Sequence, residues 1–260
     1  MINNKKIIIE GVEYTPEELD EIYKELLTPT PATPSQPRFS LGNGLQFIFD
    51  EKLYQEIVKY MDKTFPAHKE NLSGKLSFDG VMKGSSPYIA TAVDMFLKSA
   101  NSQYRIATQR DLETNLQMFK DYYEDTGLAL RSVGNPNKDR AKHLYEQIKK
   151  ANPSIKFPIF LDLRGLELDA NLNFNLTSES KYKTAECLNW KNGTKFSKTD
   201  EFGLPKEKDE NSSRQIWTLK DGLVRLYLNR YLSLYSIDES LANSYVSGRV
   251  ALVSAGGGTL

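Results

Sequence analysis

A proline-rich stretch limits this chain more than any other feature of its sequence. Within nine residues the chain has four prolines: Pro29, Pro31, Pro34 and Pro37. Proline fixes φ and has no N–H to donate, so this stretch continues neither a helix nor a central strand. It is expected to run extended, as a semi-rigid spacer. The sequence therefore divides into an N-terminal arm (1–27), a proline-rich linker (28–39), a body (40–255) and a flexible tail (256–260).

The arm is expected to form a short strand followed by a helix. The strand covers residues 7–9, and Thr15, Pro16 and Glu18 form a helix start with a capping box. A strand and a three-turn helix cannot bury a useful core alone, so the arm packs on its own body or on another subunit. In the second case the partner-binding residues are the apolar ones at helical spacing: Leu19, Ile22, Tyr23 and Leu26.

The body is predicted to have an α+β fold, with a helix-rich first half and an antiparallel β-rich second half, and with a sub-boundary near 152–156. Helix starts are expected at Asp50, Ser86, Thr108 and residues 135–137, because each combines a capping residue with a following apolar periodicity. The expected strands are 45–49, 72–78, 127–133, 157–163, 172–176 and 249–253.

The dipeptide Asp221-Gly222 predicts a two-residue β-hairpin turn. Its register pairs Leu219 with Val224 and Trp217 with Leu226 on one apolar face. Apolar residues at even positions continue to 234, which favours one long strand with a bend near Asn229 and Arg230. The preceding segment, 182–211, is mostly polar and is interpreted as a loop that is either functional or mobile.

The charge of the chain argues against nucleic acid as its main partner. Lys and Arg number 34, as do Asp and Glu, so the net charge is zero, whereas phosphate contacts favour a basic excess. The apolar run near the N-terminus is too short for a secretion signal, and no stretch has the length of a membrane span. We therefore expect synthesis in a cytoplasm and no membrane partner.

No motif in the sequence fixes a reaction. His68 and His143 do not have metal-ligand spacing, and Cys187 has no partner motif. No catalytic residue, metal site or cofactor is therefore predicted, and the chain is not expected to be an enzyme. One alternative is a metal-dependent enzyme in which Asp162, Glu167 and Asp169 hold Mg²⁺.

Two further features have both a functional and a structural interpretation. Residues 83–86 precede a helix start, and the N–H groups at a helix start are free to bind an anion. The alternative interpretation is an ordinary capped turn with no ligand. Tyrosines at 227, 231 and 235 follow one side of the predicted long strand. Tyrosine is common at protein interfaces and also on the solvent face of ordinary sheets. Tyr227 and Tyr231 are predicted to bind a partner.

Several short sequences in the body occur together in a familiar order. They are KGSSP (83–87), GLALRS (127–132), NPN (135–137), KTDEFGLP (198–205), LYL (226–228) and GRVALVS (248–254). Their order resembles proteins of crAss-like and related tailed phages that infect Bacteroidales. The resemblance covers roughly residues 70–255, leaves the arm outside, and carries over no active site. It implies a virion or virion-associated protein.

Together these observations predict a non-enzymatic structural component of a phage particle. The resemblance implies a head–tail connector or ring component, a capsid accessory protein, or a packaged protein. The expected partners are other virion proteins and copies of the same chain, and the expected location is the virion. The alternatives are the metal-dependent enzyme described above and an adaptor that binds a host protein through residues 182–211.

Overall fold

The computed structural model describes residues 7–9, 12–14, 44–219 and 221–254, and the chain divides into two compact units, 1–39 and 40–260. In the first unit, β1 (Ile7–Ile9) pairs antiparallel with β2 (Val12–Tyr14). The strand at 7–9 is confirmed, and β2 was not expected. The predicted arm helix with Leu19, Ile22, Tyr23 and Leu26, the linker and the tail 256–260 lie outside the described residues.

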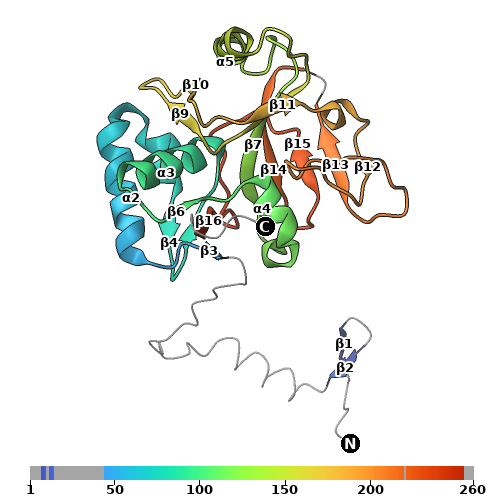
Figure 1. Ribbon diagram of the computed structural model, residues 1–260. Coiled ribbons are helices and arrows are strands. Elements are labelled where there is room, and N and C mark those ends of the chain that lie inside the picture. Colours follow the sequence, from blue (N-terminus) through green and yellow to red (C-terminus); the bar gives the residue numbers. More distant parts are fainter. Residues whose placement is uncertain (1–6, 10–11, 15–43, 220, 255–260) are drawn as a thin grey trace, which may run out of the picture. The chain divides into compact units, whose positions relative to one another are not determined.

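The second unit is built on a curled seven-stranded sheet (Figure 1). All neighbouring strands in it are antiparallel except β15 and β13, which run parallel. The spatial order is β11 (Tyr182–Thr184), β8 (Ile159–Asp162), β7 (Glu124–Leu130), β14 (Leu223–Leu228), β15 (Leu234–Ser236), β13 (Gln215–Thr218) and β12 (Thr194–Lys195). The mixed α+β fold is confirmed. Strand β7 comes from the helix-rich first half of the body, yet it lies between β8 and β14, which come from the β-rich second half.

Four α-helices of this unit are α2 (Glu51–Thr64), α3 (Pro87–Ser99), α4 (Gln109–Thr114) and α5 (Lys138–Ala151). Three of them begin at the predicted caps, because the side chains of Asp50, Ser86 and Thr108 accept hydrogen bonds from first-turn N–H groups. α5 begins differently. Asn137 has a left-handed φ of 61°, and its side-chain amide donates to the carbonyls of Leu223 and Glu239.

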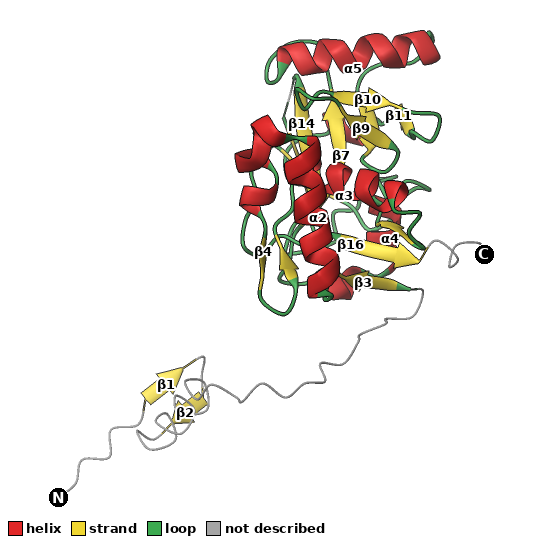
Figure 2. Cartoon of the chain, turned by 90° about the vertical axis from the view of Figure 1, so that its left-hand side faces the viewer, coloured by secondary structure: helices red, strands yellow, loops and turns green. Residues whose placement is uncertain are grey.

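Two hydrophobic cores lie on opposite faces of the sheet. Alternate strand residues supply them: Leu128 and Leu161 face the first core, whereas Ala129 and Phe160 face the second. Helices α2, α3 and α5 cover the first core, and Figure 2 shows α5 lying across the end of the unit next to β9, β10 and β11. Helix α4 and the loop between β11 and β13 close the second core.

Three smaller sheets complete the unit. Strand β16 (Ala251–Ser254) lies between β3 (Leu45–Phe47) and β6 (Tyr104–Ile106). The other two are hairpins: β9 (Leu166–Leu168) with β10 (Phe174–Leu176), and β4 (Ser77–Phe78) with β5 (Met82–Lys83). The predicted strand over 72–78 is wrong except at its end. Short 3₁₀ turns precede it, Pro66–Asn71 and Ser73–Lys75, because Ser73 and Gly74 favour turns over a ladder.

The predicted hairpin at Asp221-Gly222 is wrong. Strand β13 pairs with β15, not with β14, and Gly222 is held by the 131–136 segment: the Arg131 N–H donates to the Gly222 carbonyl. The chain reverses instead at Asn229, where a bend in a long strand was expected. The Asn229 side chain accepts the N–H groups of Tyr231 and Ser233, so β14 and β15 form the hairpin.

The segment 182–211 is largely ordered by its own buried side chains. It carries β11, a 3₁₀ turn at Glu186–Asn189 and β12. Five of its residues are buried in the second core: Ala185, Cys187, Leu188, Phe196 and Leu204. It therefore acts mainly as a cover for that core.

Candidate functional site

The candidate functional site is a row of five aromatic side chains, which we call the aromatic row: Trp217, Tyr235, Tyr227, Tyr123 and Tyr245. Pairing in the sheet creates its centre, because Tyr235 lies opposite Tyr227 on β14 and opposite Trp217 on β13. The adjacent residues Ile216, Leu228 and Leu234 point into the second core, so the three rings point to the other face of the sheet.

The rings contact one another in sequence. Their centroids are 5.9 Å apart for Trp217 and Tyr235, 5.6 Å for Tyr235 and Tyr227, 5.8 Å for Tyr227 and Tyr123, and 5.3 Å for Tyr123 and Tyr245. The first two pairs are tilted by about 30° and the last two meet edge to face. These are the arrangements that aromatic quadrupoles favour.

The aromatic row lies where no α-helix of the described residues packs on this face. Helix α3 packs on β7 and α5 on β14, and both lie away from β15 and β13 (Figure 1). Trp217, Tyr227 and Tyr235 are consequently half-buried, and Tyr245 is 52% exposed. Val246, next in the chain, is 76% exposed. Tyr123, which lies between Tyr227 and Tyr245 in the row, is only 5% exposed. The row is therefore accessible at Trp217, Tyr235 and Tyr227, and again at Tyr245 next to Val246.

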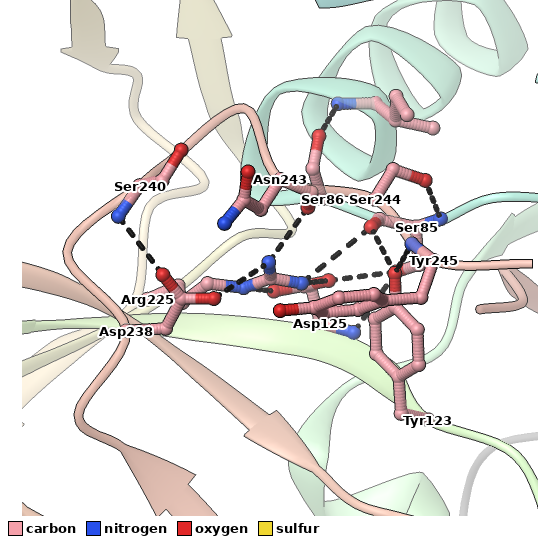
Figure 3. A network of polar contacts seen from close by, with 11 residues as sticks. Ser85, Ser86, Tyr123, Asp125, Arg225, Asp238, Ser240, Asn243, Ser244 and Tyr245 are labelled. Carbon is pink, nitrogen blue, oxygen red and sulfur yellow. Dashed lines mark hydrogen bonds and ion pairs between the residues drawn. The ribbon is translucent and has the colours of Figure 1, made fainter. Parts of the chain in front are cut away.

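A buried arginine supports two rings of the aromatic row. The Arg225 guanidinium lies 4.8 Å from the Tyr227 ring centroid and 5.5 Å from that of Tyr123, within the range of cation–π attraction. Arg225 is fully buried and pairs with the carboxylate of Asp125, which is also buried (Figure 3). Burial works against the charge on Arg225, but attraction and hydrogen bonds from Asp125 outweigh it and raise the pKa of the guanidinium.

A β-bulge brings Asp125 to Arg225. Leu226 pairs with Gly127, yet the next residue, Tyr227, pairs with Asp125, so Thr126 is the extra residue. Without the bulge, Asp125 would point to the opposite face of the sheet. The remaining donors of Arg225 bond to the Asn243 carbonyl at 2.6 Å and to Asp238 at 3.4 Å, so the network holds the loop after β15.

The loop 83–86, considered as an anion site, is filled by the protein's own groups. The Ser85 hydroxyl donates to Asp125 at 2.9 Å, and the Ser85 N–H donates to the Ser244 hydroxyl at 3.0 Å (Figure 3). The Ser86 hydroxyl accepts the Ile89 N–H as the cap of α3, and the Gly84 N–H bonds to the Gly248 carbonyl. The capped-turn interpretation therefore fits this loop.

The two tyrosines predicted to bind a partner, Tyr227 and Tyr231, do not lie on one long strand as expected. Tyr227 is the middle ring of the aromatic row. Tyr231 lies in the reversal between β14 and β15, is 68% exposed, and accepts a hydrogen bond from Arg230 at 2.6 Å. Trp217, Tyr123 and Tyr245 were missed, because long-range contacts place them in the row: strand pairing for Trp217, and packing of the segments before β7 and after β15 for Tyr123 and Tyr245. The β-propensity of 215–218 was the one sequence signal for Trp217.

The three carboxylates that were considered as ligands for Mg²⁺, those of Asp162, Glu167 and Asp169, lie in separate structural settings. Asp162 is buried at the end of β8 and accepts the Arg164 N–H, whereas Glu167 is exposed on β9. Asp169 caps a turn by accepting the N–H groups of Asn171 and Asn173. Among the described residues, no group of three His, Cys, Asp or Glu side chains is placed to hold a metal ion.

The histidines and the cysteine are also held by structural contacts. His68 bonds to the Ala170 carbonyl at 3.0 Å and His143 to the Asn175 side chain at 2.9 Å, so each pins a helical segment to the β9–β10 hairpin. Burial raises the pKa of Cys187 to about 12, so its thiol keeps its proton at neutral pH and is a poor nucleophile.

A second surface feature lies on the 182–211 segment. A shallow hollow of about 610 Å³ is lined by Asn189, Trp190, Lys191, Asn192, Thr218 and Leu219. The Asn192 side chain accepts the Thr218 N–H at 2.6 Å and so fixes one wall of the hollow. Its lining combines one aromatic ring with amide and ammonium groups, which suits a polar partner better than a purely apolar one.

Comparison with family models, with curated proteins and with solved structures finds no match to this chain. The resemblance to phage virion proteins therefore stays a prediction. None of the helices in the described residues is long and apolar enough to cross a membrane.

Proposed function

We propose that this protein is a non-enzymatic structural component of a phage particle that acts through contacts with other subunits. The observation that carries this proposal is the aromatic row, whose strand residues Trp217, Tyr235 and Tyr227 are half-buried on a sheet face where no α-helix of the described residues packs. Tyr and Trp are enriched at protein interfaces, because their rings bury large areas and their polar atoms still reach partners.

The support beneath the row favours a binding surface that is rigid before the partner arrives. Arg225 and Asp125 fix the loop that carries Tyr245 and hold the ring of Tyr227 from below. A partner therefore meets rings that have already lost much of their rotational freedom, and less entropy is lost on binding. Such anchors commonly contribute about 2 kcal/mol or more each when they lie at the centre of an interface.

The wider setting of the proposal comes from the sequence. The zero net charge and the lack of a reaction motif suit a subunit contact more than catalysis or nucleic-acid binding. The resemblance to virion proteins suggests a connector, ring or capsid accessory role after synthesis in the host cytoplasm. Other virion proteins and copies of this chain are the proposed partners, and the arm residues Leu19, Ile22, Tyr23 and Leu26 are a second proposed contact.

The test compares full-length variants in assembly. We expect Tyr227→Ala and Tyr235→Ala to lose incorporation into the particle, while Tyr182→Ala, at the opposite edge of the same sheet, keeps it. Copy number per particle and mass in solution are measured, with far-UV circular dichroism to show that each variant is folded. Normal incorporation of both row variants would refute the role of the row.

Deletion of residues 1–37 tests the arm separately. We expect the shortened chain to keep the circular dichroism of the body and to lose assembly. A shortened chain that still incorporates at the wild-type copy number would remove the arm from the proposal and leave the aromatic row as its basis.

A second candidate function is a host-protein adaptor that uses the hollow on the 182–211 segment. The observation in its favour is the hollow itself, with Trp190 and Lys191 in its lining. Trp190→Ala would then abolish capture of a host protein without changing incorporation into the particle. Unchanged capture by this variant would exclude the hollow as the adaptor site.

A further inference from the structure

The proline-rich linker has a repeat that the aromatic row is chemically suited to bind. Pro31, Pro34 and Pro37 are each three residues apart. A polyproline II helix has three residues per turn, so these prolines share one edge of it. Grooves lined by aromatic rings bind such segments, because flat rings pack on pyrrolidine rings and the ligand is already ordered.

The three accessible rings offer this ligand a row of neighbouring apolar contacts. The centroids of Trp217, Tyr235 and Tyr227 are 5.9 and 5.6 Å apart. A polyproline II helix repeats every roughly 9 Å, so one turn of it is longer than one of these steps and can contact two neighbouring rings. Neighbouring rings among Trp217, Tyr235 and Tyr227 are tilted by about 30° to one another, and all three side chains are half-buried. The nine residues from Pro29 to Pro37 would span about 28 Å as a polyproline II helix, enough to cross the three accessible rings Trp217, Tyr235 and Tyr227.

The hydrogen-bond donors of the aromatic row also complement the acceptors of a polyproline II segment. A polyproline II segment offers solvated carbonyl acceptors, and its prolines have no N–H. Residues 44–219 and 221–254 provide no hydrogen-bond partner for the indole N–H of Trp217 or for the hydroxyls of Tyr235 and Tyr227. Burial raises the pKa of Tyr227, so its hydroxyl keeps its proton and remains a donor.

The charges of the proline-rich segment and of the edge of the aromatic row are opposite and therefore complementary. Residues 28–38 contain no acidic side chain and one basic side chain, Arg38, directly after Pro37. At the edge of the row, the Asp238 carboxylate lies close enough to Tyr227 to affect its pKa and keeps 17% of its side chain exposed. A carboxylate at this edge favours a segment that ends in a base.

We propose that the aromatic row binds the proline-rich sequence, residues 28–38, of a second copy of this chain. The inference rests on the proposed function, in which the row is a subunit contact, and it names the partner of that contact. Each copy then offers one row and one proline-rich segment. Such a head-to-tail contact is heterologous and generates a ring or an open series of copies.

The test uses a fluorescent peptide of residues 28–38 and full-length protein carrying Pro31→Ser, Pro34→Ser and Pro37→Ser, so that its own segment does not compete. Fluorescence anisotropy should show saturable binding. Tyr235→Ala in this background should weaken it by on the order of tenfold or more. Tyr235→Phe, which keeps the ring and loses the hydroxyl, should weaken it less. Tyr182→Ala should bind normally, and a peptide with the three prolines replaced by Ala should not bind.

The mass of the protein in solution tests the second copy. Wild-type protein should associate as its concentration rises, and the triple Pro→Ser protein should stay monomeric. Absence of saturation at millimolar protein, equal binding by Tyr235→Ala, or a monomeric wild type would each overturn the inference. If the peptide fails to bind while Tyr235→Ala still loses particle incorporation, the proposed function stands and only its partner is wrong.

Discussion

Replacement of the buried arginine beneath the aromatic row tests the physical basis of the site. Arg225→Met keeps an unbranched side chain of similar length and removes the guanidinium. In the wild type this group bonds to Asp125, to the Asn243 carbonyl and to Asp238. The variant leaves the Asp125 carboxylate buried, with the Ser85 hydroxyl as its remaining side-chain donor among the described residues.

The magnitude follows from this burial. Removing one partner of a buried ion pair leaves an uncompensated charge and costs about 3–5 kcal/mol. Both side chains here are completely buried, so solvent does not screen the loss. For a chain of this size the change corresponds to a fall of about 1–2 M in the urea midpoint.

The pH dependence of the loss distinguishes a stranded charge from a packing defect. Without Arg225, burial raises the pKa of Asp125 further above that of the unfolded chain, which releases its proton near 3.8. The folded variant then binds a proton that the unfolded chain releases, so its free energy of unfolding falls as the pH rises above about 4. The gap between wild type and variant should therefore be smaller near pH 4 than at pH 7.

Urea unfolding followed by circular dichroism at pH 4, 5, 6 and 7 measures these differences. Arg230→Met is the matched control, because Arg230 is exposed and its loss should change stability by less than about 0.5 kcal/mol. Adding Asp125→Leu to Arg225→Met should recover part of the loss. A loss below about 1 kcal/mol, or one independent of pH, would refute the argument from the buried pair.

Three further predictions follow from single buried groups. Burial raises the pKa of Asp162 to about 7, so the free energy of unfolding should fall between pH 4 and 7, and Asp162→Asn should flatten that fall in urea titrations. Cys187 should resist a thiol reagent at pH 8 until urea unfolds the chain, and rapid labelling of native protein would contradict its burial. Gly222→Ala should lower the melting temperature by several degrees, because φ is +68° and the new Cβ would lie 2.3 Å from the Pro136 nitrogen, whereas Gly134→Ala should be tolerated better.

Local chemistry predicted the helix starts of this fold. Asp50, Ser86 and Thr108 each act within three residues of themselves, so neighbouring sequence is sufficient to identify them as caps. The strand over 72–78 failed for the same local reason, because Ser73 and Gly74 favour a turn that the apolar neighbours concealed.

The β14–β15 hairpin shows why strand partners were not predictable. Leu228 pairs with Leu234 and Tyr227 with Tyr235, so the turn joins even positions to even positions and odd to odd. The alternation of apolar residues is then the same for one long strand as for a hairpin, and periodicity cannot distinguish them. The aromatic row depends on this pairing and on a parallel partner for β13, which only long-range packing selects.

The position of β16 has a consequence for the synthesis of the protein. This last strand lies between β3 and β6, and the Ser254 N–H donates to the Gly44 carbonyl, so the small sheet joins the two ends of the described body. At translation rates of 5–20 residues per second, β16 is synthesised roughly 10 to 40 s after β3, the strand with which it pairs. A chain that stops before Ala251 leaves Leu45 and Phe47 without that cover. The small sheet therefore cannot close until residues 251–254 have been synthesised.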